Sequence, residues 1–190
     1  MQSVAVRCDA GHNLMIQLDG LTGVMPREEC ALGIDTGQTR EIAILSRVGK
    51  PVCFHVQRIE GNTAYLSRRT AQQEALHALF TERRPGDILP VRVTHLEPFG
   101  AFVDVGCGLI SLIGIENLSV SRIFHPSDRV SVGQLLRAVI SGMDEETGRI
   151  SLTHRELLGT WEQNAAQFAA GETVCGIVRS VEDYGVFIEL

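Results

Sequence analysis

The sequence predicts an all-β protein made of tandem small barrels that are joined by short helices. Three observations predict this class. Short apolar runs alternate with turn residues, a pattern of segments recurs after about 85 residues, and the hydrophobic period changes to that of a helix between the copies. Because 190 residues exceed the common size of a single domain, we expect more than one barrel.

The repeat is clearest around two short aromatic segments. Residues 97–105 (EPFGAFVDV) and 182–190 (EDYGVFIEL) share an aromatic-Gly-x-aromatic arrangement, and Gly86 and Gly171 each stand 13 residues before the first aromatic residue. Earlier in the chain, residues 48–60 resemble residues 132–144. We therefore predict a degenerate barrel over 1–69, a helical linker over 70–85, a complete barrel over 86–155, a second helical linker over 156–170 and the start of a third barrel over 171–190.

The middle copy predicts a five-stranded barrel of the OB type. The alternation of apolar and polar residues predicts strands near 88–97, 101–105, 109–115, 134–143 and 149–153. Residues 144–149 (DEETGR) predict a tight hairpin, with Gly148 at a left-handed position. Residues 125–130 (HPSDRV) predict one helical turn between the third and fourth strands.

Apolar residues in the two linkers follow a helical period. The first linker places Ala71, Ala75, Leu76, Leu79 and Phe80 on one face, and Pro85 ends that helix. The second predicted helix, within 155–168, does the same with Leu157, Trp161, Ala165 and Phe168. We expect both helices to couple neighbouring barrels rigidly.

The third copy stops after its second predicted strand. Because an isolated pair of strands is marginally stable in water, we expect residues 171–190 to be ordered by packing on the second linker helix or on another chain. We also expect the sequence to be a piece of a longer protein.

Composition limits the possible functions. The formal net charge of −6 argues against a protein that holds nucleic acid mainly by neutralising phosphates. The acidity belongs to residues 156–190, and sixteen of the seventeen basic residues are arginines, which stack on bases as well as pair with phosphates. No apolar run is long enough to span a membrane and no signal peptide is recognisable, so we expect a cytoplasmic protein.

No motif predicts an enzyme, a metal site or a cofactor. The five cysteines are scattered without metal-ligand spacing and are expected to be reduced thiols. The sequence has no H-E-x-x-H segment, no G-x-S-x-G elbow and no Gly-rich phosphate loop before a helix. We therefore expect no catalytic residue, no metal ligand and no cofactor.

Taken together, the motifs of residues 86–155 resemble a known family. The segments PGDILPVRVTHLEPFGAFVDVG, IENLS, HPSDRVSVGQ and DEETGRISLTHR follow, in order, the pattern of the S-one type RNA-binding domain, the repeated OB-fold unit of the largest protein in the small bacterial ribosomal subunit. The resemblance extends over the chain as two copies and part of a third. It implies that RNA lies across one face of the barrel, where aromatic side chains stack on bases.

The resemblance implies Phe99 and Phe102 as the stacking pair of the middle copy, with Arg149 and Asp144 at the far edge of the same face. Both rings share a face only if Gly100 bends the chain between them. The alternative for the two phenylalanines is ordinary core packing, and the alternative for Arg149 is a solvated hairpin position.

Four further residues complete the predicted RNA-binding set. Tyr184 and Phe187 occupy the matching positions of the third copy, and a tyrosine hydroxyl is more compatible with an exposed surface than with a dry core. Arg92 and His95 alternate with core positions on the first strand of the middle copy and are expected to line the same groove. The alternative for Arg92 and His95 is solvent exposure without function.

The sequence departs from the family pattern at two places. Gly114 stands where the family usually has a histidine, which predicts weaker binding. In the first copy, residues 12–15 (HNLM) replace the aromatic pair, and Asn13 is expected to tolerate a turn with positive φ. We therefore expect the first barrel to be a docking or scaffold barrel.

The leading hypothesis is a non-catalytic bacterial protein that binds single-stranded, mRNA-like RNA in translation or RNA metabolism. The first alternative is a protein-interaction scaffold that docks on the ribosome or another assembly. The second alternative is the accessory RNA-binding part of an RNA-processing enzyme.

Overall fold

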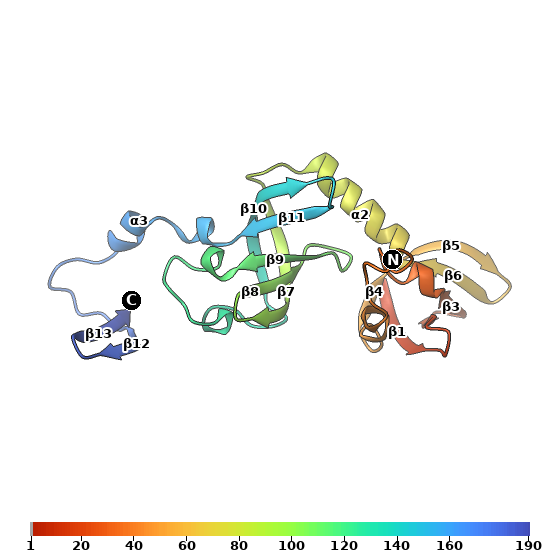
Figure 1. Cartoon of the computed structure of the whole chain (residues 1–190), viewed down its shortest axis with the longest axis horizontal. Coiled ribbons are helices and arrows are strands. Elements are labelled where there is room, and N and C mark those ends of the chain that lie inside the picture. The colour runs from red at the N-terminus through yellow and green to blue at the C-terminus, as the bar shows by residue number, and fades with distance from the viewer. Residues whose placement is uncertain (1) are drawn as a thin grey trace.

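The computed structural model describes residues 2–190, so Met1, the first residue of the first predicted barrel, lies outside it, as do the side chains of Gln2 and Trp161. Two curled β-sheets and a terminal hairpin follow one another along the molecule, and helix α2 (Arg68–Glu82) bridges the first two (Figure 1). Within residues 2–190, no helix is long and apolar enough to cross a bilayer.

The middle copy forms a closed barrel. Its strands close in the order β10-β11-β9-β8-β7, and a 3₁₀ turn, η3 (Pro126–Asp128), lies between β9 and β10. The predicted strands and the predicted helical turn are thereby confirmed, with each strand end within one residue. The strand bounds are β7 (Ile88–Glu97), β8 (Gly100–Asp104), β9 (Ile110–Gly114), β10 (Leu135–Asp144) and β11 (Arg149–Thr153).

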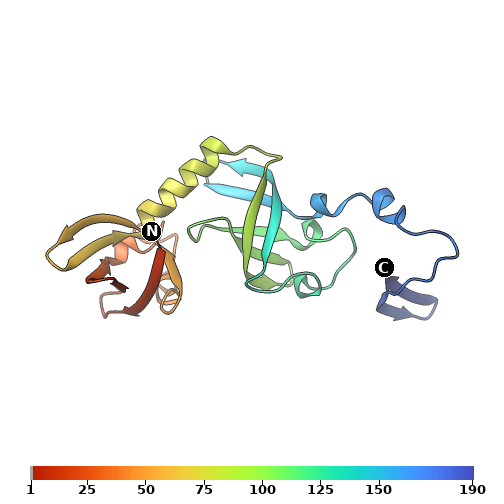
Figure 2. The same cartoon turned by 180° about the vertical axis from the view of Figure 1, so that it is seen from behind.

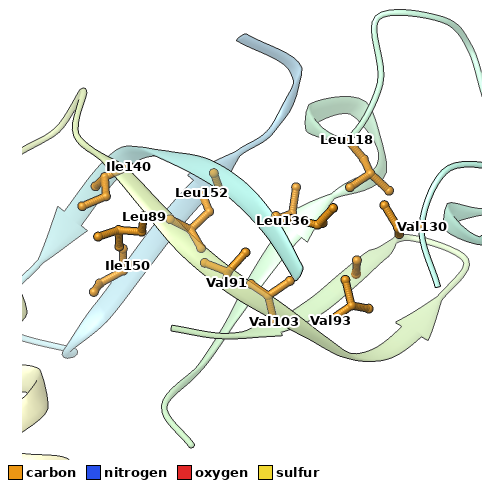
Figure 3. Close-up of a cluster of buried hydrophobic side chains, with 13 residues drawn as sticks. Leu89, Val91, Val93, Val103, Leu118, Val130, Leu136, Ile140, Ile150 and Leu152 are labelled. Atoms are coloured by element: carbon orange, nitrogen blue, oxygen red, sulfur yellow. The ribbon is translucent and has the colours of Figure 1, made fainter. Parts of the chain in front are cut away.

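Alternation along these strands fills the barrel with aliphatic side chains. On β7 the buried residues are Leu89, Val91 and Val93, while the residues between them face outward. Branched side chains from the other strands and from the β9–β10 connection complete the core (Figure 3). Because one face of every strand packs into this core, functional side chains of the barrel must lie on the outer face.

The first copy is a six-stranded sheet that curls in the same way, in the order β4-β1-β2-β3-β6-β5. Its end strands β4 and β5 are separated in sequence only by the buried Phe54, so together they take the place that the single strand β10 has in the middle barrel. Helical turns η1 (Arg27–Glu29) and α1 (Ile42–Leu45) lie between β3 and β4. The strand bounds are β1 (Gln2–Cys8), β2 (Leu14–Leu18), β3 (Leu21–Met25), β4 (Pro51–Cys53), β5 (His55–Glu60) and β6 (Thr63–Ser67).

Helix α2 joins the two barrels through buried polar side chains. The Ser67 side chain caps the helix by accepting a hydrogen bond from the Thr70 amide. Arg68, which is buried, donates to the carbonyl oxygens of Cys30 (3.1 Å) in the first barrel and Gly108 (3.4 Å) in the middle barrel. Gln72 also donates to the Gly108 carbonyl, at 3.2 Å. These bonds tie the β8–β9 loop, which reaches toward the first barrel in Figure 2, to the linker helix.

We expect Arg68→Met to lower the free energy of unfolding by about 1–2 kcal/mol, because the buried contact with the Cys30 carbonyl loses its donor, whereas the Gly108 carbonyl keeps Gln72. Urea denaturation measures the change, and Arg83→Met, at an exposed arginine after the same helix, is the control. An Arg68→Met midpoint equal to that of the wild type would show that the junction does not depend on this side chain.

The second linker differs from the prediction. The expected continuous helix is broken into η4 (Arg155–Leu158) and α3 (Trp161–Ala165), because Gly159 adopts a φ of +82°. The Thr160 hydroxyl then starts the second helix by accepting a hydrogen bond from the Gln163 amide. Five residues of helix cannot act as the rigid coupler that we expected.

The C-terminal segment is a hairpin of β12 (Ile177–Glu182) and β13 (Gly185–Glu189), which pair only with each other among the described strands. Glu189 forms ion pairs with Arg179 on β12 and with Arg129 of the middle barrel. Most of its apolar side chains are exposed, as is Phe168 before it. The expectation that this segment packs on the second linker helix is therefore wrong.

Candidate nucleic-acid interface

The two phenylalanines of the middle barrel lie together on its outer surface. Phe102 is on β8 between the buried residues Ala101 and Val103, so its side chain points outward. Phe99 is in the turn before β8 and is 55% exposed. The two ring centroids are 6.1 Å apart and the ring planes meet at 85°. Phe99 is therefore exposed and Phe102 partly exposed, so neither ring is packed in the core of the barrel.

Gly100 is needed between the two rings for a reason that the sequence did not reveal. Phe99 precedes the first residue of β8, so the alternation of the strand does not separate the two rings. Gly100 is paired with Gly114 of β9, and a Cβ atom at Gly100 would collide with the carbonyl oxygen of Ile113. Glycine is therefore required because β8 and β9 approach closely at this point, whereas the bend that we expected at Gly100 is replaced by regular strand pairing with Glu97 and Gly114.

His95 extends the aromatic surface onto β7. It pairs with Phe102 across the strands, after a bulge between Val93 and His95, and the two ring centroids are 6.2 Å apart with planes inclined by 29°. The His95 Nε2 atom lies 2.7 Å from a carboxylate oxygen of Glu97. Three rings of the middle barrel, from Phe99, Phe102 and His95, thus form one continuous patch.

The strand register continues this patch across the barrel. Leu112 on β9 pairs with Phe102, and Ser151 on β11 pairs with Leu112. We call His95, Phe102, Leu112 and Ser151 the outer row of the middle barrel. Leu112 and Ser151 were not predicted as site residues, although the alternation of β9 and β11 places both on the outward face.

The predicted arginines flank the outer row. Arg92 pairs with Asp104 across β7 and β8, is exposed, and donates to the Gly133 carbonyl at 2.9 Å. Arg149 lies two residues before Ser151 on β11, so its side chain is on the same face. Within residues 2–190, the structure assigns Arg149 no ion pair. The Arg149 side chain is thus exposed on the outward face.

Asp144 stabilises the hairpin turn that precedes Arg149. Its carboxylate accepts hydrogen bonds from the Thr147 hydroxyl, at 2.6 Å, and from the amides of Glu146 and Thr147. These bonds, led by the Thr147 hydroxyl, lower the pKa of Asp144, and Arg149 adds a smaller effect in the same direction. Asp144 therefore shapes the turn that holds Arg149 and leaves the guanidinium group accessible.

Gly114 leaves space that an acidic side chain fills. A Cβ atom at Gly114 would lie 2.8 Å from the carboxyl carbon of Glu116. The position where the family resemblance led us to expect a histidine is thus covered by a carboxylate, which repels RNA phosphates. Weaker binding at this position stays a prediction.

The C-terminal hairpin repeats the aromatic pair. The rings of Tyr184 and Phe187 have centroids 6.1 Å apart and planes at 87°, and Tyr184 is 82% exposed. Since the Phe99–Phe102 pair has nearly the same distance and angle, the aromatic-Gly-x-aromatic segment determines this arrangement locally.

A polar network takes the place of the aromatic pair in the first barrel. The His12 Nδ1 atom lies 2.9 Å from Glu41, and Glu41 also pairs with Arg27 at 2.6 Å, which lowers the pKa of the Glu41 carboxyl. Asn13 donates to the Asp9 carboxylate at 2.9 Å. The positive φ falls on His12, at +62°, and not on Asn13 as predicted, because the Asn13 side chain is held by Asp9 and by the Arg27 amide.

The cleft between the two barrels is less suited to RNA than the aromatic face. It has a volume of about 680 Å³ and lies beside α2, and its lining includes the acidic residues Asp35, Glu145 and Glu146 against the single basic residue Arg69. Among the described residues, no group of three or more His, Cys, Asp or Glu side chains is placed to hold a metal ion. The open aromatic face is thus the stronger candidate.

A closed five-stranded barrel of this topology with an outward aromatic face is an OB-type module of the class that binds nucleic acids. Residues 82–155 match the family model described as the S1 RNA binding domain. The chain is 30% identical over 180 residues to the small ribosomal subunit protein bS1 of Leuconostoc lactis, covering 93% of this chain and 41% of that protein. The chain is therefore similar to proteins built from S1 RNA-binding domains, and residues 82–155 match the domain itself.

Two further proteins are similar to parts of this chain. The bS1 protein of Rhizobium meliloti (strain 1021) is 29% identical over 183 residues, covering 92% of this chain and 31% of that protein. The chain thus spans about a third of the length of the curated relatives that it matches. Among solved structures, GSP13 from Bacillus subtilis is similar with 25% identity and a TM-score of 0.38, over 46% of this chain and 73% of that one.

Proposed function

We propose that the chain binds single-stranded RNA by stacking bases on the outer faces of its middle barrel and its C-terminal hairpin, in translation or RNA metabolism and without catalysing a reaction. One observation carries the proposal: two separate copies present a surface aromatic pair with nearly the same geometry, and only Phe102 of these four rings is partly rather than largely exposed. The match of residues 82–155 to the S1 RNA binding domain supports it.

The energetics favour stacking over phosphate neutralisation. Stacking of a base on an exposed ring contributes about 1–3 kcal/mol and tolerates any base. The phosphate contribution is small, because the chain has a formal net charge of −6 and the two arginines that we place beside the outer row of the middle barrel are Arg92 and Arg149. We therefore expect micromolar affinity with little sequence preference.

Because stacking contributes more than phosphate contacts, we expect the RNA affinity to depend only weakly on salt concentration. For a single strand the slope of log K against log salt is about −0.7 per neutralised phosphate, so two arginines predict a slope between roughly −1 and −2. Fluorescence anisotropy with a mixed-sequence RNA, measured between low and physiological salt, gives this slope. A much steeper slope would place binding on another, cationic surface. Absence of binding at low salt would refute the proposal.

A second candidate function is docking on the ribosome or another protein assembly. The exposed apolar side chains of the C-terminal hairpin favour it, and the curated relatives are ribosomal proteins. Co-sedimentation with small ribosomal subunits separates the two functions: docking through protein contacts persists after RNA competitor is added, whereas docking through RNA does not. The accessory part of an RNA-processing enzyme remains a third candidate, which co-purification with a nuclease activity would support.

A further inference from the structure

The first barrel has an outer row of its own, and this row contains an aromatic ring on a different strand. Arg7 on β1 pairs with Met15 on β2, and Met15 pairs with Val24 on β3. Val24 then pairs with Tyr65 on β6. Since Gly23 and Met25 beside Val24, and Ala64 and Leu66 beside Tyr65, are all buried, the Val24 and Tyr65 side chains face outward.

An arginine completes the row. Arg58 on β5 pairs with Tyr65, and its guanidinium carbon lies 3.9 Å from the centroid of the Tyr65 ring. The two residues belong to the β5–β6 hairpin, which extends away from α2 in Figure 1. We call Arg7, Met15, Val24, Tyr65 and Arg58 the outer row of the first barrel.

The two outer rows correspond strand by strand. Met15 stands where the middle barrel has Phe102, and Val24 stands where it has Leu112. Tyr65 takes the place of Ser151, since each is the partner of the third strand on the parallel strand that follows. The first barrel therefore lacks the aromatic pair at the usual place but retains one ring on the same surface, two strands further along the row.

The Arg58–Tyr65 pair has the chemistry of a stacking platform. A guanidinium group that lies over an aromatic ring presents a flat, cationic face outward, and unpaired bases stack on arginine planes as well as on aromatic rings. The side chain of Arg58 is 56% exposed, so this outer face is open to solvent.

The charges along the row allow a nucleic acid to bind. Arg58 is paired with Glu60 at 2.7 Å, but both side chains are more than half exposed, and a solvent-exposed ion pair of this kind holds its partners weakly. A phosphate can therefore replace Glu60 as the partner of Arg58. At the other end of the row Arg7 is exposed and adds a second positive charge.

We propose that the outer row of the first barrel is a second contact surface for single-stranded RNA, with a base stacked on the Arg58–Tyr65 pair and Arg7 near a phosphate. This inference rests on the proposed RNA binding of the middle barrel and changes the function expected of the first barrel from scaffold to RNA contact. A long RNA would then contact both barrels of one chain.

The test uses the full chain and two RNAs, of about 6 and about 24 nucleotides, since an OB fold covers about 4–16 nucleotides. Arg58→Gln and Tyr65→Ala are each expected to weaken binding of the longer RNA about three- to tenfold and to leave binding of the shorter RNA within twofold. Tyr65→Phe keeps the ring and is expected to bind as the wild type does. Arg83→Ala, which removes an exposed arginine outside the row, is the matched control.

Photo-crosslinking gives a readout that does not depend on stability. With a 4-thiouridine-labelled RNA of about 24 nucleotides, we expect a crosslinked peptide that contains Tyr65, and we expect its loss in Arg58→Gln. Unchanged affinity of Arg58→Gln for the longer RNA, together with no crosslink at residues 55–67, overturns this inference while leaving the middle barrel as the RNA site. If the wild-type protein binds neither RNA, the proposed function itself fails.

Discussion

Replacing Phe99 and Phe102 together by alanine is expected to weaken binding of a short single-stranded RNA at least tenfold. Each ring is a stacking platform worth about 1–3 kcal/mol, and tenfold corresponds to about 1.4 kcal/mol. The loss should be similar for RNAs of different sequence, because stacking does not read the hydrogen-bonding edges of bases. Fluorescence anisotropy with a 6-nucleotide RNA measures it.

Phe124 provides the matched control for this double variant. It lies in the β9–β10 connection of the same barrel and is 68% exposed, but it is outside the outer row. Phe124→Ala removes an exposed ring of the same size, so we expect its affinity to remain within twofold of the wild type. If the double variant keeps its fold by circular dichroism and binds RNA as the wild type does, the two phenylalanines are not the RNA site.

The middle barrel could be predicted well because its determinants are local. Apolar and polar residues alternate clearly along strands β7 to β11. The segments between these strands contain glycine, proline and aspartate, which are typical of turns. The second linker was mispredicted because the hydrophobic period of residues 155–168 was weighed above a local signal. Thr160 and Gln163 form a capping box, which starts a new helix inside the predicted one.

The site residues that could be predicted are likewise those that depend on local sequence. The pairs Phe99–Phe102 and Tyr184–Phe187 were found because a repeat placed similar segments 85 residues apart. The relation of Tyr65 to Met15 was not found, since it depends on which strands pair across the sheet and in which register. Sequence distance gives no measure of that pairing, and a one-residue shift would have turned Tyr65 into the core.

Gly100→Ala is expected to lower the free energy of unfolding of the middle barrel by about 2–3 kcal/mol, because the added methyl group would collide with the backbone carbonyl of Ile113. For a domain of this size the melting temperature should fall by roughly 10–20 °C. Calorimetry measures the transition. RNA affinity should fall as well, since a displaced β8 moves Phe99 and Phe102 apart.

Gly114→Ala separates this steric effect from the general cost of replacing a strand glycine. Gly114 is the cross-strand partner of Gly100, but the three atoms nearest to its added methyl group all belong to the carboxylate of Glu116, which is the end of a flexible side chain and can rotate away. We therefore expect Gly114→Ala to change the unfolding free energy by less than about 1 kcal/mol. Equal destabilisation by both variants would contradict the close approach of β8 and β9 as the reason for Gly100. A large loss for Gly100→Ala alone would show that the aromatic face depends on that close approach.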